Sequence, residues 1–178
     1  VNFLFSPIFI DSEDLADLAN LKEHVTRSGA LMLLLTPNVL SRPWVLIEVV
    51  TAIRNEVNVI LVEVQRPGSK YVYPDQEFYT SILDGKLVNH WLDQQGVEHL
   101  AREGISLPEV VESLKKIFHK IALPFSPHKT KTIREAELRD ILRRCEGKLG
   151  SRTLNMGPSL SIATEQSAVR KPSELSLY

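Results

Sequence analysis

The chain has 178 residues, which suits one domain of ordinary size, and its 43% hydrophobic and 24% charged residues are typical of globular proteins. A formal net charge of -1 argues against wholesale binding to nucleic acid or to an acidic membrane surface. The single cysteine, Cys145, excludes an intrachain disulfide and fits a reducing compartment. No apolar run approaches the roughly 20 residues needed to span a bilayer, so we expect no membrane partner.

Strand and helix patterns alternate from the start of the chain. Residues 7–11 predict a short strand, and Asp11 and Ser12 are good N-caps for the helix that follows. Apolar residues at near-helical spacing extend that helix to about Arg27. Residues 30–36 are apolar without alternation, which predicts a strand buried on both faces, as in a parallel sheet.

The next elements repeat this alternation. Ser41 is the predicted N-cap of a helix that runs to about Asn55, with Pro43 in its first turn. Residues 57–64 predict a second buried strand. Strands that alternate with helices indicate a doubly wound, flavodoxin-like parallel sheet with helices on both faces. Ligands of such sheets bind beyond the carboxyl ends of the strands.

After residue 64 the alternation of strands and helices is less regular. Helices are predicted at 75–83, 91–102, 108–118 and 130–147, and a strand that Pro124 would confine to an edge is predicted at 121–125. From Gly150 the sequence is rich in serine and lacks periodicity, which predicts a disordered tail over 150–178. Residues 1–149 are therefore expected to form one domain.

Glu48 is the most informative single residue. It lies among apolar residues of the helix predicted at 41–55, four residues after Trp44. A buried carboxylate must be paired, neutralised or turned toward a wet cleft. One interpretation is a structural pair with Arg42 or Arg54. The other is a functional carboxylate, because this helix begins at the edge of the sheet where ligands bind.

Three stretches together resemble a TIR domain (the Toll/interleukin receptor domain) of the plant and protist type. They are "FIDSEDL", "LLLTPNVLSRPWVLIEVVTAI" and "VNVILVEV", and the match covers about residues 5–64. In that family a loop with Asn, Ser and Trp follows a strand, and a Glu comes four residues after the Trp. The matching positions here are Asn38, Ser41, Trp44 and Glu48.

The resemblance implies a cytoplasmic signalling domain with one of two functions. Some TIR domains hydrolyse NAD as substrate, without a cofactor, and their catalytic Glu corresponds to Glu48. Trp44, Ser41, Asp11 and Ser12 would then contribute to substrate binding. The alternative is a non-catalytic module that associates with itself or with other TIR domains.

A lone carboxylate suits NAD hydrolysis. Nicotinamide leaves NAD as a neutral molecule, so no general acid is needed. The positive charge that develops on the ribose is what one carboxylate stabilises.

Several residues retain a structural interpretation. Trp44 is a candidate core residue, and Asp11 and Ser12 are explained by helix capping alone. Tyr71 and Tyr73 follow a strand, where they would be surface aromatics on a turn or would stack on a base. The five histidines and Cys145 lack metal-ligand spacing, so no metal site is predicted.

The family pattern also places a strand, a loop and a helix before residue 7. Only six residues precede that position. The sequence therefore predicts an N-terminally incomplete TIR domain whose exposed strand edges favour association.

Overall fold

The structure, a computed structural model, describes residues 18–84 and 94–146. Its elements, in chain order, are α1 (Leu18–Arg27), β1 (Ala30–Leu35), the 3-10 helix η1 (Val39–Ser41), α2 (Pro43–Arg54), β2 (Asn58–Val64), α3 (Gln76–Leu83), α4 (Gln94–Arg102), α5 (Leu107–Phe118), β3 (Leu123–Phe125) and α6 (Lys131–Glu146). The strand predicted at 7–11, with Asp11 and Ser12, and the tail predicted at 150–178 lie outside the described residues.

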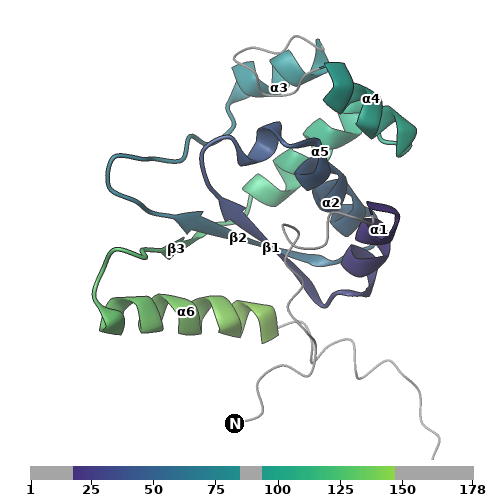
Figure 1. Cartoon of the computed structure of the whole chain (residues 1–178). Helices are drawn as coiled ribbons and strands as arrows, with labels where there is room; N and C mark the ends of the chain where they lie inside the picture. Colours follow the sequence, from purple (N-terminus) through teal and green to yellow (C-terminus); the bar gives the residue numbers. More distant parts are fainter. Residues whose placement is uncertain (1–17, 85–93, 147–178) are drawn as a thin grey trace, which may run out of the picture.

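The three strands form a parallel sheet in the order β1-β2-β3. Leu33 of β1 is paired with Leu61 of β2, and Val62 of β2 with Leu123 of β3. Figure 1 shows α2 and α5 on one side of this sheet and α6 on the other. The predicted α/β class with a parallel sheet is confirmed, and the arrangement is compatible with a flavodoxin-like fold. Pro124 lies in β3, at an edge of the described sheet, as its missing N–H requires.

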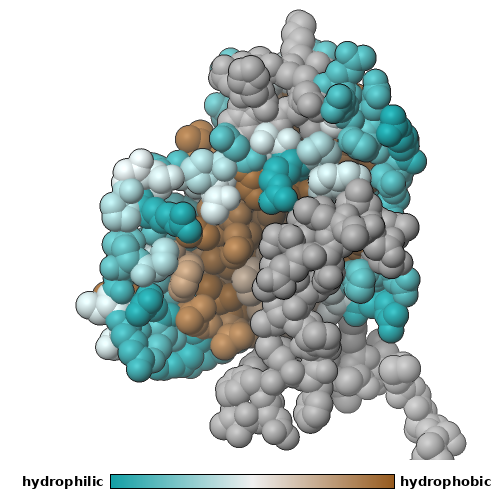
Figure 2. All heavy atoms as spheres, viewed as in Figure 1, coloured by the Kyte–Doolittle hydropathy of each residue, from teal (hydrophilic) through white to brown (hydrophobic). Residues whose placement is uncertain are grey.

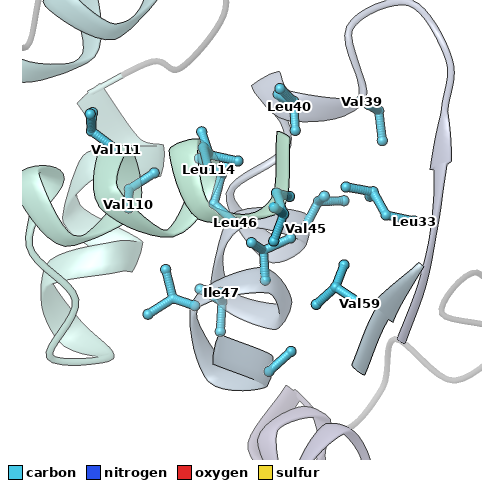
Figure 3. Packing of buried hydrophobic residues seen from close by; sticks show 14 of the residues in the cluster. Leu33, Val39, Leu40, Val45, Leu46, Ile47, Val59, Val110, Val111 and Leu114 are labelled. Carbon is cyan, nitrogen blue, oxygen red and sulfur yellow. The ribbon is translucent and has the colours of Figure 1, made fainter. Parts of the chain in front are cut away.

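The main core lies between the sheet and α2. Leu33 and Leu61 point to this side, where they pack in one buried cluster with side chains of α2 and α5. Figure 3 shows Leu33 and Val59 of the strands beside Val45 of α2, with Leu114 of α5 on the far side of that helix. Because α2 is covered by the sheet and also contacts α1, α4 and α5, it is apolar on nearly every side.

The opposite face of the sheet is only partly covered. Ile60 and Val62 of β2 pack on Ile141 of α6, but Met32 and Leu34 of β1 remain 43% and 48% exposed. The prediction that the strand at residues 30–36 is buried on both faces is therefore wrong. The physical reason is the position of α6, which packs along β2 and β3. Figure 2 shows the resulting apolar surface over the sheet.

The start of α2 also differs from the prediction. Residues Val39–Ser41 form the 3-10 turn, and the N-cap of α2 is Arg42, whose side chain makes no capping hydrogen bond. The Ser41 hydroxyl instead donates to the Asn38 carbonyl at 2.7 Å. Asn38 adopts a left-handed backbone (φ 64°), which asparagine tolerates better than most residues. The prediction of Ser41 as N-cap is wrong because this turn holds its hydroxyl.

Two other helix starts follow the usual rules. The Asp75 carboxylate accepts a hydrogen bond from the Phe78 backbone N–H, and the Ser106 hydroxyl accepts one from that of Glu109. These contacts confirm the helices predicted near 75 and 108. Within the described residues, no helix is both long and apolar enough to cross a membrane.

Candidate functional site

Glu48 is a half-buried side chain in a buried stretch of helix. Its neighbours Ile47 and Val49 are each 1% exposed. Because the preceding strand β1 ends at Leu35 and α2 begins at Pro43, the first turns of α2 lie next to the carboxyl end of β1. Glu48 lies in the second turn and is partly exposed.

Trp44 lies one helical turn before Glu48. Residues four apart share a face of a helix, so the indole and the carboxylate belong to the same side of α2. The Trp44 side chain is half-buried and packs against the main core. The two interpretations of Trp44, core residue and wall of a site, are therefore compatible.

His99 of α4 lies against Trp44. The centroids of the imidazole and indole rings are 5.1 Å apart, and the ring planes are tilted by 47°. His99 is also half-buried. Sequence reasoning missed this residue because 55 positions separate it from Trp44. Only the packing of α4 on α2 brings the two rings together.

The two local arginines were the predicted partners for a structural Glu48. The Arg54 guanidinium is directed to α5, where its Nε and one Nη contact the two carboxylate oxygens of Glu109 at 2.6 and 2.7 Å. The same group donates to the Gly104 carbonyl at 2.8 Å. Residues six apart point to different sides of a helix. Arg54 is therefore a poor partner for Glu48, and the structural pair of Glu48 with Arg42 stays a prediction.

The other predicted site residues are distributed differently. Ser41 lies in the turn just before Trp44, and its hydroxyl is held by the Asn38 carbonyl. Asp11 and Ser12 fall outside the described residues. Of the five predicted residues, the structure thus brings together Glu48 and Trp44 on one face of α2, with Ser41 at the entrance to that helix.

Tyr71 and Tyr73 form an aromatic cluster with Phe118. Tyr71 is only 4% exposed, its ring is 5.0 Å from that of Tyr73, and it stacks on Phe118 at 6.5 Å. The interpretation of Tyr71 as a surface aromatic is therefore wrong, because α5 covers it. Tyr73 is 44% exposed, and its hydroxyl donates to the Glu63 carboxylate at 2.7 Å.

Burial changes the acidity of these phenols. Desolvation raises the pKa of Tyr71, and the nearby phenols and Glu63 add to the effect. Desolvation, together with the hydrogen bond to Glu63, raises the pKa of Tyr73 to about 12. Both hydroxyls therefore remain protonated at neutral pH.

In the part of the chain that the structure describes, no group of three or more His, Cys, Asp or Glu side chains is arranged to hold a metal ion. Comparisons with models of known protein families, with characterised proteins and with solved structures give no match to this chain.

Proposed function

We propose that the chain is a TIR-type signalling domain that hydrolyses NAD and releases nicotinamide, with Glu48 as the catalytic carboxylate. One observation carries this proposal: α2 places a half-buried glutamate one turn after a half-buried tryptophan, in a helix whose other central residues are buried. A carboxylate in such a place is a better candidate for chemistry than one on a solvated surface.

The proposed reaction, hydrolysis of NAD, needs one carboxylate from the protein. The bond between nicotinamide and the ribose breaks, and its electron pair leaves with neutral nicotinamide. Glu48 stabilises the positive charge that develops on the ribose. Water then adds to that carbon and loses a proton, which gives ADP-ribose. Trp44 and Ser41 would contact the substrate on the same side of α2, with Asp11 and Ser12 as further candidates.

The test compares two glutamates. Glu48→Gln removes the charge with little change in volume, and we expect nicotinamide release from NAD to fall by about two to three decades. The control is Glu63→Gln, a half-buried glutamate on β2 that bonds Tyr73, for which we expect wild-type activity. An inactive wild type, or an active Glu48→Gln variant, contradicts the proposal. An unfolded Glu48→Gln variant supports the structural interpretation of this carboxylate.

A second candidate function is a non-catalytic module that associates with further copies of itself. The observation in its favour is the exposed apolar face of β1, where Met32 and Leu34 are 43% and 48% exposed beside the covered part of the sheet. Figure 2 shows an apolar surface over the sheet. In the described sheet β1 is an end strand that pairs only with β2. End strands are common places for a further chain to pair.

Sedimentation at several protein concentrations tests this second function. Replacing both Met32 and Leu34 with Gln should weaken association at least tenfold. Ile121→Gln changes an 86% exposed side chain outside the strands and should leave association unchanged. A wild type that stays monomeric, or equal effects of the two changes, excludes this surface as the interface.

A further inference from the structure

We infer that His99 is a positioning residue for the proposed site: its ring fixes the orientation of the Trp44 indole, which in turn forms the wall beside Glu48. The inference rests on the proposed function of Glu48. It adds a residue from α4, a separate helix, to a site that the sequence placed on α2 and its flanking loops.

The first support is the geometry of the ring pair. Two aromatic rings with centroids 5.1 Å apart and a tilt of 47° lie within the range in which such rings attract one another. Both side chains are half-buried. The contact with His99 restricts the rotamers open to Trp44, because an indole swung away from α4 loses that contact.

The second support is the anchoring of α4. Leu100, the residue after His99, is 0% exposed in the main core. The turn that ends α4 is bound on two sides: the Gly104 carbonyl accepts from Arg54 of α2, and the Glu103 carbonyl accepts from Lys22 of α1. His99 therefore lies on a helix end whose position relative to α2 is fixed, as a positioning role requires.

The third support is the spacing on α2. Trp44 and Glu48 are one turn apart on the same face, so a change in the indole rotamer alters the surface next to the carboxylate. Substrate that binds against this surface would be less well oriented without His99. We therefore expect the loss of His99 to lower the rate of nicotinamide release as well as to weaken the binding of NAD.

The experiment uses Trp44 as its own probe. Trp91→Phe leaves Trp44 as the sole tryptophan of the chain. In that background, His99→Ala should shift the Trp44 emission to longer wavelength, and His99→Phe, which keeps a flat ring, should restore the original spectrum. His119→Ala, at an exposed histidine that ends α5, should leave the spectrum unchanged.

Nicotinamide release by the same variants completes the test. We expect kcat/KM for NAD to fall about tenfold in His99→Ala, in a protein that remains folded, and to recover in His99→Phe. A shifted spectrum with wild-type kcat/KM, or an unchanged spectrum, overturns the positioning role and leaves the role of Glu48 intact. Absence of nicotinamide release from the wild type refutes the proposed function and this inference together. A fall in kcat/KM that His99→Phe does not reverse also contradicts positioning by ring packing.

Discussion

Arg54, the last residue of α2, and Glu109, in the first turn of α5, form a two-pronged ion pair that ties these helices together. The hydrogen bond with Glu109 raises the pKa of Arg54, and the same bond lowers the pKa of Glu109. Both side chains are about one-third exposed or more, with fractions of 41% and 32%. Solvent therefore screens the pair and keeps its contribution modest.

We predict that Glu109→Gln lowers the free energy of unfolding by about 0.5–1 kcal/mol at neutral pH. Because the pKa of Glu109 is lower in the folded state, this contribution is present above its unfolded pKa, near 4.3, and is lost as the pH falls through the folded pKa. Urea unfolding from about pH 7 to about pH 3 should show the two proteins converging in acid. The control, Glu98→Gln, removes a more exposed pair with Arg102 at 3.6 Å and should have little effect. A difference that persists unchanged in acid contradicts this account.

The second prediction concerns helix capping. Asp75 and Ser41 are both of residue types that often cap helices, but only Asp75 does so here. The Asp75 carboxylate accepts from the Phe78 backbone N–H at 2.8 Å, so Asp75→Ala should cost about 1 kcal/mol of stability. The Ser41 hydroxyl caps no helix, so Ser41→Ala should cost less than about 0.5 kcal/mol. Denaturant midpoints measure both changes. Equal losses would mean that Ser41 does cap α2 in solution.

Where apolar runs were long, the sequence predicted the positions of the strands well. Residues 30–36 and 57–64 predicted β1 and β2 to within one residue at each end, and the parallel arrangement followed from their lack of alternation. The exposure of Met32 and Leu34 was not predictable in the same way. It depends on where α6 packs, and that position is set by contacts of Ile141 with β2, far away in the chain.

The candidate site was predictable only along α2. Helical spacing placed Trp44 and Glu48 on one face from the sequence alone. His99 has no local signal that links it to Trp44, because the contact depends on how α4 packs against α2. Tyr71 was misjudged for the same reason: its burial depends on Phe118 of α5, 47 residues later. Patterns within a short stretch of sequence predict one helix or strand at a time. The contacts of His99 with Trp44 and of Tyr71 with Phe118 depend on how separate elements pack together.

The tyrosine cluster predicts a loss of stability in alkali. Burial raises the pKa values of Tyr71 and Tyr73, and also that of Tyr79, a buried residue of α3, and the pKa of Tyr73 reaches about 12. Unfolded phenols ionise near pH 10. Stability is therefore fully present below about pH 10 and is lost as the pH rises toward the folded values. Tyr178→Phe removes the one other tyrosine of the sequence, so that absorbance reports these three residues alone. In that background the near-ultraviolet absorbance of tyrosinate should appear together with unfolding, whereas ionisation of all three near pH 10 in a still folded chain would contradict the burial of these rings.

Two neighbouring hydroxyls of this cluster give the last prediction, because their surroundings are opposite. In the described part of the chain, the Tyr71 hydroxyl oxygen is buried without a hydrogen-bond partner, whereas the Tyr73 hydroxyl donates to Glu63 at 2.7 Å. A buried hydroxyl without a partner is destabilising, so Tyr71→Phe should leave stability unchanged or raise it by about 0.5–1.5 kcal/mol. Tyr73→Phe loses a half-exposed hydrogen bond and should lower stability by about 0.5–1 kcal/mol. Urea unfolding at neutral pH compares the two variants, which remove the same atom from adjacent rings. A loss of more than about 1 kcal/mol in Tyr71→Phe would show that this hydroxyl has a bonding partner in solution.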